Sequence, residues 1–222
     1  MKTKINVMES IYDRNKILAA ELNKELSKKN IFCINVLGAP GVGKTMSLMQ
    51  IITKLQIPAY VLEGDISSDI DTQKLLSLGI KTVQINTNAC HLDVHDTVKA
   101  VQKIEFSNGF LFIENIGNLV CPAEFMIGEH IKLLITAITD GSDKPYKYPL
   151  AFEKADIILL NKIDLKAFTD FDFDFFINGI RRLNPGVPVF QVSGKTGEGF
   201  DAAVKWLENK ASKLRATIKQ QY

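Results

Sequence analysis

The sequence has no long apolar run and little net charge. No stretch approaches the roughly 20 residues of a membrane-spanning helix, and no apolar signal-peptide core follows the first lysines. The 27 basic and 25 acidic residues leave a net charge of +2, so the balance of charge gives no indication of nucleic-acid binding. We therefore expect a cytoplasmic protein that binds neither nucleic acid nor membranes.

Cysteine is also scarce. The three cysteines, Cys33, Cys90 and Cys121, are an odd, small set that indicates thiols or metal ligands rather than a disulfide framework. Cys33 lies within an apolar run and is expected in the core. The 222 residues are 46% hydrophobic and 23% charged, as in ordinary globular chains. We expect residues 1–222 to form a single domain.

Short apolar runs alternate with helical patterns along the chain. The expected strands are residues 31–37, 59–62, 82–85, 110–113, 131–137, 156–160 and 187–190. The expected helices are residues 7–28, 46–52, 67–77, 92–105, 170–183 and 199–214. The first is amphipathic and, within residues 1–29, is expected to pack on the domain, while Ser67 or Ser68 is expected to cap the third. The alternation predicts a three-layer α/β fold with a mostly parallel central sheet and helices on both faces.

A glycine-rich loop follows the first expected strand. Residues 38–45 read Gly-Ala-Pro-Gly-Val-Gly-Lys-Thr, the G-x-x-x-x-G-K-T pattern of the phosphate-binding loop of P-loop NTPases. The residues expected to line a polyphosphate, at a helix N-terminus that favours anions, are Gly38, Gly41, Val42 and Gly43. Lys44 is expected to reach the β- and γ-phosphates, and Thr45 to hold Mg²⁺. The alternative is a chance match in a glycine-rich turn, which the flanking strand and helix disfavour.

Two later loops indicate guanine rather than adenine. Asn161-Lys162-Ile163-Asp164 follows a buried strand, and the Asp164 carboxylate can accept two N–H bonds from a guanine edge. Asn161 is expected to contact the ring nitrogen and carbonyl, and the stem of Lys162 to cover the ring. After the last strand, Ser193-Gly194-Lys195 resembles a loop that supports the guanine carbonyl through backbone N–H groups. The alternatives are a loop of caps and solvated charges, and a plain turn before a helix.

Carboxylates at two strand ends are candidates for the Mg²⁺ site. Glu114 precedes Gly117 at the place where most GTPases have an Asp that senses Mg²⁺ and the γ-phosphate. Asp65 is the natural second carboxylate, whereas Asp69 and Asp71 are expected on a solvated helix face. Asn118 follows Gly117, so a water-orienting Gln of the Ras type is absent. The alternative for Glu114 is a strand-end carboxylate that caps a turn.

A second metal signal comes from sulfur and nitrogen. Cys90-His91 follows one strand and Cys121 follows another, so both lie at the edge of the sheet that carries the nucleotide. Thiolate and imidazole form a set suited to Zn²⁺ or Ni²⁺. The alternative is buried thiols beside a surface histidine. His95 is a possible fourth ligand, although we expect it on a solvated helix face. We predict no function for His130.

These motifs together carry a family resemblance over about residues 20–210. The stretches that carry it are residues 63–65, 83–86, 90–93, 112–123, 143–145, 147–149 and 160–165. They resemble the hydrogenase nickel-incorporation GTPase, whose nearest relative is the urease accessory GTPase. The most specific stretch, Phe-Ile-Glu-Asn-Ile-Gly-Asn-Leu-Val-Cys-Pro-Ala at residues 112–123, joins the switch glutamate to the metal cysteine.

The resemblance implies a function, cofactors and partners. It implies a slow, Mg²⁺-dependent GTPase that converts GTP to GDP, binds Ni²⁺ or Zn²⁺ through Cys90, His91 and Cys121, and forms a homodimer with GTP. The implied partners are other hydrogenase accessory proteins and the hydrogenase large subunit, to which nickel is delivered. Two alternatives stay open: a nucleotide-gated scaffold that barely hydrolyses GTP, and a urease-type accessory GTPase. Cys121-Pro122 is followed by Ala123 rather than His, which favours the hydrogenase branch.

The sequence departs from the family at two points. The N-terminus has neither the Cys motif nor the His-rich tract that binds nickel in many members, which puts a nickel-storage role in doubt. Met46 stands where the family usually has Thr, but Thr45 is kept, so Mg²⁺ binding is expected to survive.

Overall fold

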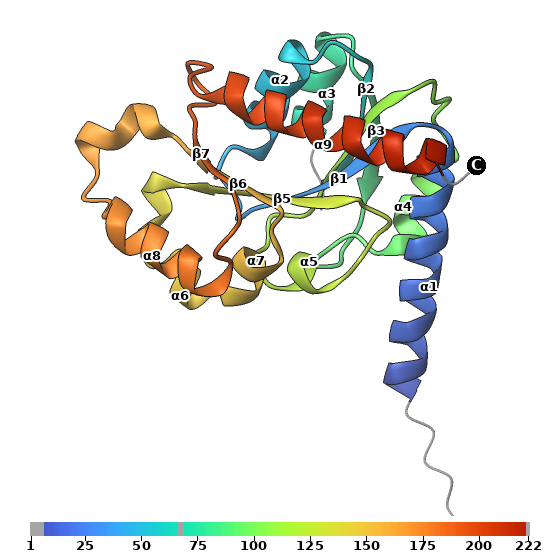
Figure 1. Cartoon of the computed structure of the whole chain (residues 1–222), viewed down its shortest axis with the longest axis horizontal. Helices are drawn as coiled ribbons and strands as arrows, with labels where there is room; N and C mark the ends of the chain where they lie inside the picture. Colours follow the sequence, from blue (N-terminus) through green and yellow to red (C-terminus); the bar gives the residue numbers. More distant parts are fainter. Residues whose placement is uncertain (1–6, 66–68, 221–222) are drawn as a thin grey trace, which may run out of the picture.

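The protein is built on one seven-stranded sheet, seen in a computed structural model that describes residues 7–65 and 69–220. The strand order is β3-β2-β4-β1-β5-β6-β7, and every paired neighbour runs parallel (Figure 1). The strands are β1 (Ile31–Leu37), β2 (Ala59–Asp65), β3 (Lys81–Asn86), β4 (Gly109–Glu114), β5 (Ile131–Ala137), β6 (Ile157–Asn161) and β7 (Val189–Gln191). The parallel sheet expected from the alternating pattern is confirmed.

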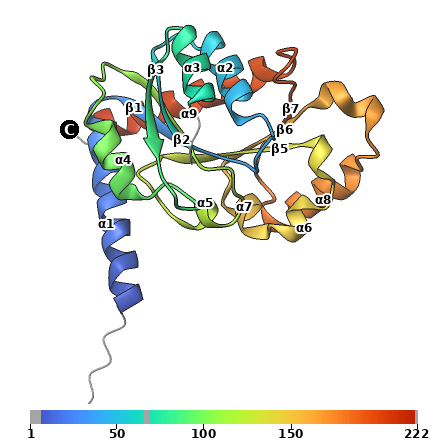
Figure 2. The same ribbon diagram turned by 180° about the vertical axis from the view of Figure 1, so that it is seen from behind.

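Helices cover both faces of this sheet (Figures 1 and 2). One face carries α2 (Lys44–Lys54), α3 (Ile70–Ser77) and α9 (Phe200–Gln220). The other carries α1 (Val7–Lys28), α4 (Val94–Val101), α5 (Cys121–Glu124), α6 (Lys144–Lys147), α7 (Pro149–Lys154) and α8 (Phe173–Leu183). Two 3₁₀ helices, η1 (Ile138–Asp140) and η2 (Ile163–Phe168), follow β5 and β6. Among the described residues, no helix combines the length and the apolar character that crossing a bilayer requires.

The alternation of side chains along β1 places successive residues in cores on opposite faces of the sheet. Phe32 and Ile34 belong to the core beneath α2 and α9, whereas Ile31 and Cys33 belong to the core beneath α1 and α4. Every residue of β1 is buried, because a central parallel strand has helices on both sides. Cys33 is fully buried, as expected. The sheet is therefore a rigid platform whose strand ends carry the polar loops.

Several boundaries differ from the sequence expectation. β2 continues to Asp65, so residues 63–65, which were expected to follow the strand, belong to it. Helix α3 begins at Ile70 with Asp69 at its N-cap position, and Ser67 and Ser68, expected as its cap, lie outside the described residues. The short helices α5, α6 and α7 were not expected, because four to six residues are too few for a helical period to show in a sequence.

Candidate functional site

The phosphate loop lies at the carboxyl ends of the central strands. A cavity of about 270 Å³ opens there, lined by the loop, by the end of β2 and by the segment after β4. Its lining includes Lys44, Asp65 and Glu114, which the sequence assigned to phosphate and Mg²⁺. Gly43 opens helix α2 with φ +90°, in the left-handed region that favours glycine. The loop and the candidate carboxylates therefore face one space.

Glu114 is held in a buried position beside the loop. The Thr45 hydroxyl donates a hydrogen bond of 2.9 Å to Glu114 Oε1, while Glu114 Oε2 meets no hydrogen-bond partner among the described residues. Burial raises the pKa of Glu114 to about 7, although Lys44 and the Thr45 hydroxyl oppose the rise. An orphaned buried carboxylate oxygen next to a Thr hydroxyl is a donor set that fits a Mg²⁺ ion.

A second glutamate, which sequence reasoning missed, lines the same cavity. Glu63 stands opposite Glu114 in the β2–β4 register and accepts a 2.9 Å hydrogen bond from the Thr72 hydroxyl. Burial raises the pKa of Glu63, and nearby Asp65 and Asp71 raise it further. Asp71, which we placed on a solvated helix face, is half-buried and lines the cavity, while its carboxylate pairs with Lys74 at 2.8 Å.

The two loops assigned to guanine meet each other beside the phosphate loop. Asn161 is 2% exposed, donates through Nδ2 to the Val42 carbonyl at 2.8 Å, and accepts through Oδ1 from the Gly194 N–H at 2.8 Å. Its amide therefore joins three loops instead of pointing freely at a base, because a buried amide must satisfy its own polar atoms. Asp164 Oδ1 accepts a hydrogen bond of 2.6 Å from the Ser193 hydroxyl, and this bond fixes the carboxylate.

Backbone N–H groups of these loops also form hydrogen bonds within the protein. The Ser193 N–H donates to the Glu198 carbonyl at 3.0 Å, so this N–H and that of Gly194 are already engaged within the protein. Lys162 adopts φ +63°, and its Nζ lies 3.4 Å from the Thr139 hydroxyl. Lys195 is exposed at the rim. The structure thus joins Asn161 to Gly194 and Asp164 to Ser193, whereas the Lys162 ammonium lies against Thr139.

The sulfur and nitrogen ligands also converge. The ligand atoms of Cys90, His91 and Cys121 all lie within 4.8 Å of one another, and the two sulfur atoms are 3.1 Å apart. Burial lowers the pKa of His91, which favours the neutral imidazole that binds metals. His95 is exposed on α4 and lies outside this group in the part of the chain that the structure describes. We call Cys90, His91 and Cys121 the metal triad.

Two asparagines connect the triad to the end of β4. Asn115 Oδ1 accepts from the Leu92 N–H at 2.9 Å, and Asn118 Nδ2 donates to the Cys90 carbonyl at 3.1 Å. Leu92 and Cys90 flank His91, so the segment after Glu114 holds both sides of the histidine's backbone. Sequence reasoning gave these asparagines no such role, because a side chain that bridges two loops leaves no periodic signal.

The same segment lies directly against the phosphate loop. Gly38 forms an isolated antiparallel bridge with Asn118. A Cβ on Gly117 would lie 2.9 Å from Pro40 Cγ and 3.1 Å from Pro40 Cα and N, so only glycine allows this approach. The phosphate loop, the segment 114–121 and the loop 90–92 are therefore in consecutive contact.

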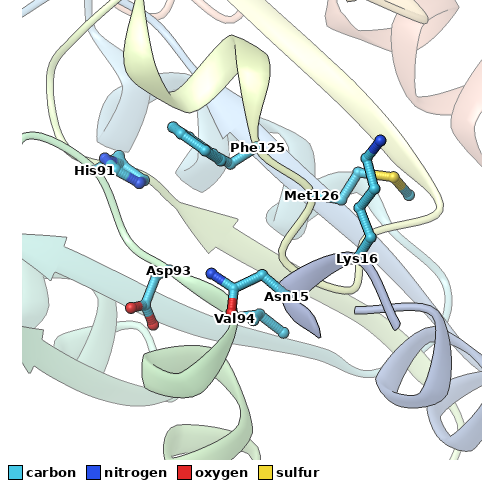
Figure 3. Close-up of a pocket in the computed structure, with 7 residues that line it drawn as sticks. All are labelled: Asn15, Lys16, His91, Asp93, Val94, Phe125 and Met126. Carbon is cyan, nitrogen blue, oxygen red and sulfur yellow. The ribbon is translucent and has the colours of Figure 1, made fainter. Parts of the chain in front are cut away.

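A small cavity of about 220 Å³ opens beside His91 (Figure 3). The rings of His91 and Phe125 are stacked, with centroids 4.6 Å apart and planes inclined by 9°. Asn15 and Lys16 of α1 and Met126 complete the wall with residues from the start of α4 (Figure 3). The sequence did not indicate the role of Phe125, since a single aromatic residue after a metal ligand is usually read as core.

Comparisons with known proteins show the family of the chain. The family model described as "CobW/HypB/UreG, nucleotide-binding domain" matches residues 32–191. The hydrogenase maturation factor HypB of Azotobacter chroococcum is 41% identical, over 96% of this chain and 72% of its own. The crystal structure of HypB from Helicobacter pylori in complex with nickel is 30% identical, with a TM-score of 0.86 over 90% of this chain and 96% of that chain.

A second solved structure supports the same assignment. HypB from Archaeoglobus fulgidus is 30% identical, with a TM-score of 0.83 over 90% of this chain and 99% of that chain. The predicted P-loop NTPase fold and the predicted family resemblance are both confirmed. The chain belongs to the CobW/HypB/UreG family, as a member of its HypB hydrogenase maturation factors.

Proposed function

We propose that the chain is a slow, metal-regulated GTPase that couples GTP binding and hydrolysis to nickel insertion during [NiFe]-hydrogenase maturation. The observation that carries the proposal is the single segment 114–121. It begins at the buried Glu114, touches the phosphate loop at Gly117 and Asn118, and ends at the triad's Cys121. A change at the γ-phosphate would therefore move a metal ligand, which is a local switch with a wider readout.

The proposed nucleotide site uses residues of three loops. The backbone of Gly38, Gly41, Val42 and Gly43 and the Lys44 ammonium receive the phosphates. Asp164, fixed by Ser193, accepts from guanine, and Lys195 supplies a backbone N–H to its carbonyl. Thr45, Glu114 and Asp65 are the proposed Mg²⁺ ligands, and a bound Mg²⁺ would neutralise charge on the phosphate oxygens.

The chain's own groups explain why hydrolysis should be slow. Lys44 stabilises the charge that develops on the γ-phosphate. Glu114 Oε2, which meets no hydrogen-bond partner among the described residues, reaches Mg²⁺ through a water or orients the attacking water. Asn118 cannot do so, because its Nδ2 donates to Cys90 and its Oδ1 accepts from the Val120 N–H at 2.9 Å. Segment 114–121 thus has no glutamine of the Ras type, and Glu114 is its candidate for orienting the water.

Nickel is the proposed cargo, and the metal triad would hold it. The solved nickel complex of a relative supports this proposal. Each chain offers three ligands, whereas Zn²⁺ normally takes four and Ni²⁺ in N/S surroundings often takes four in a plane. Two chains brought together by GTP would share thiolates and complete the shell. We therefore propose a GTP-dependent homodimer that hands nickel to accessory proteins or to the hydrogenase large subunit.

The test is a titration of Ni²⁺ and of Zn²⁺ into the GDP form and into a GTP-analogue form, with mass followed by light scattering. Linkage requires that GTP and metal change each other's affinity by the same factor. We expect different metal affinities in the two forms and a loss of binding in Cys121→Ala. His95→Ala, an exposed neighbour on α4, is the matched control and should bind metal normally. Identical affinities in both forms would contradict the coupling.

Single-turnover hydrolysis of GTP with Mg²⁺, with and without Ni²⁺, separates the GTPase from a nucleotide-gated scaffold. A GTPase forms GDP and phosphate at a rate that depends on Mg²⁺. A scaffold binds GTP and changes mass while the nucleotide stays intact.

A further inference from the structure

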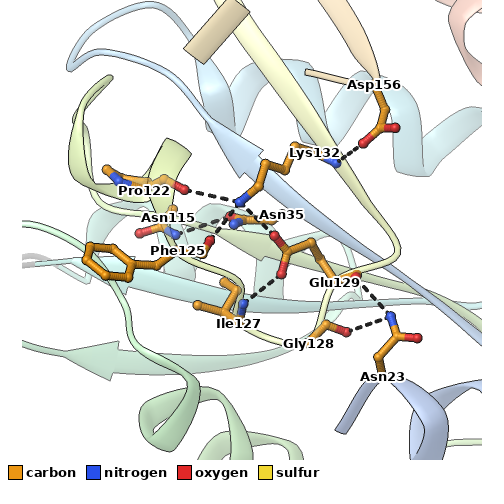
Figure 4. A network of polar contacts seen from close by, with 10 residues as sticks. All are labelled: Asn23, Asn35, Asn115, Pro122, Phe125, Ile127, Gly128, Glu129, Lys132 and Asp156. Carbon is orange, nitrogen blue, oxygen red and sulfur yellow. Dashed lines mark hydrogen bonds and ion pairs between the residues drawn. The ribbon is translucent and has the colours of Figure 1, made fainter. Parts of the chain in front are cut away.

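Lys132 of β5 is a buried lysine with three partners. It is 8% exposed, and its Nζ lies 2.7 Å from Glu129 Oε1, 2.7 Å from the Phe125 carbonyl and 3.3 Å from the Pro122 carbonyl. The ammonium donates hydrogen bonds to the two carbonyl groups and forms an ion pair with the Glu129 carboxylate (Figure 4). Buried lysines are rare unless they are paired, so the position demands a reason.

Both carbonyl groups belong to the segment that carries Cys121. Pro122 lies in the four-residue helix α5, and Phe125 ends it. A helix this short leaves its carbonyl groups without intrahelical donors, and charge-assisted bonds from Lys132 satisfy two of them. The ammonium therefore ties the backbone on the C-terminal side of Cys121 to the central sheet.

The acidic partner ties down the continuation of the same segment. Glu129 Oε2 accepts from the Ile127 N–H at 2.7 Å. Asn23 of α1 donates to the Glu129 and Gly128 carbonyls at 2.8 and 3.3 Å. These bonds fix the backbone between α5 and β5 from both sides (Figure 4).

The second ligand is reached through an aromatic ring. Phe125 presents its carbonyl to Lys132 and its ring to His91, on which it stacks at 4.6 Å. Fixing the Phe125 backbone therefore fixes the surface against which the imidazole lies. Figure 4 shows the contact of Lys132 with Phe125, and Figure 3 shows the ring of Phe125 beside His91. One ammonium thus acts on His91 across the stack, and on Cys121 through the backbone of α5.

Stability alone does not account for this ion pair. Desolvation of two buried charges is expensive, and apolar residues of similar volume are often as stable or more stable in their place. Partners that orient a metal ligand, in contrast, commonly change metal affinity by about 10–100-fold. We propose that Lys132 is a positioning residue of the metal triad, which sets Cys121 through α5 and His91 through Phe125. The inference rests on the proposed nickel binding by that triad.

The experiment compares nickel binding in the wild type and in the double variant Lys132→Met/Glu129→Gln. The pair of changes removes both charges together, so no unpaired charge is left buried. Nickel sulfate is titrated, and binding is followed by the thiolate-to-nickel charge-transfer absorption. We expect nickel affinity to fall about 10–100-fold and the absorption band to shift, while GDP affinity stays unchanged. Unfolding in urea is measured alongside.

Asn184→Leu is the matched control. Asn184 Nδ2 donates to the carbonyls of Phe152, Glu153 and Ala155 at 3.3, 3.1 and 2.8 Å, so it ties the end of α7 as Lys132 ties α5. The control should lose stability and keep wild-type nickel affinity and absorption. An equal loss of nickel affinity in Asn184→Leu would show general loosening and overturn the positioning role.

Two single variants complete the design. Phe125→Leu removes the stack on His91 and leaves the contacts of Lys132 with the backbone intact, so nickel affinity should fall less than in the double variant. An unchanged nickel affinity in Phe125→Leu would overturn the proposal that Lys132 positions His91 through Phe125. This outcome can be read even if the double variant fails to fold. Unaltered nickel binding in Cys121→Ala overturns the proposed metal site itself. Loss of binding in Cys121→Ala together with wild-type affinity and absorption in the double variant overturns only the role of Lys132.

Discussion

The nucleotide end and the metal triad differ in how far the protein has arranged them in advance. At the nucleotide end, Thr45, Asn161 and Ser193 are buried and hydrogen-bonded to other loops of the site. In the triad, Cys90 is exposed and its loop follows β3, an edge strand that is only partly buried. The nucleotide end is therefore a buried frame, whereas the metal loop is more exposed and is held mainly by segment 114–121 and Phe125.

The largest expected effect removes the positive charge of the buried frame. Lys44→Ala should lower the rate of GTP hydrolysis by about 10²–10³-fold or more, because preorganised groups that face developing charge contribute on that scale. Single-turnover hydrolysis measures the rate, and Lys54→Ala, a lysine at the other end of α2, is the control. Near-normal turnover in Lys44→Ala would remove the phosphate loop from the chemistry.

A second test measures how much the buried Glu114 lowers the stability of the protein before ligands bind. Burial raises the pKa of Glu114 from 4.5 to about 7, so its contribution to stability is full below pH 4.5 and is lost as the pH rises to 7. In EDTA and without nucleotide, Glu114→Gln should be more stable than the wild type at pH 8, by about 3 kcal/mol, with a smaller gain at pH 5.

Urea unfolding at the two pH values measures this difference. Glu153→Gln removes an exposed carboxylate and should change stability little at either pH. An equal effect of Glu114→Gln at pH 5 and pH 8 would be inconsistent with the titration of this group.

The base-recognition part of the frame is tested by Asp164→Asn. An amide replaces one of the two acceptor oxygens with a donor, and losing a charged hydrogen bond costs about 1.5–3 kcal/mol, or roughly ten- to a hundredfold in GDP affinity. Competition between GDP and ADP measures the change, and Asp170→Asn, an exposed neighbour, serves as the control. Equal binding of ATP and GTP by the wild type would refute the guanine assignment.

The smallest expected effect concerns the contact between the two regions. Asn118→Ala removes the hydrogen bond to the Cys90 carbonyl, which is worth about 0.5–1.5 kcal/mol. The ratio of nickel affinities in the GDP and GTP-analogue forms should move towards one, by a few-fold. Thr87→Ala removes a bond to the Ala89 N–H within the same loop and should leave the ratio unchanged. If both variants behave alike, coupling does not run through Asn118.

The sequence predicted the strands and the phosphate loop because both are local patterns. β1 and β5 have the expected ends, since apolar residues on two-sided strands form continuous runs. The composition of residues 38–45 likewise fixes a strand–loop–helix unit. The helices α5 to α7 could not be predicted, because they are shorter than two helical turns.

The contacts between loops were beyond a reading of the sequence. Glu63 gives no sign in the sequence that it shares a cavity with Glu114, because their proximity comes from the pairing of β2 with β4. Lys132, a charged residue within an apolar strand, would by itself suggest an exposed position. Its burial depends on carbonyl groups that only the folded chain brings within reach.

The contact between Gly117 and Pro40 has a consequence for mutations at residue 117. One added methyl group at residue 117 would clash with Pro40 and force the segment and the phosphate loop to shift, while every proposed nucleotide ligand and nickel ligand would still be encoded. If the proposed coupling holds, we expect this variant to bind GTP and to bind nickel in separate assays, and to show its defect only when both are measured in the same sample.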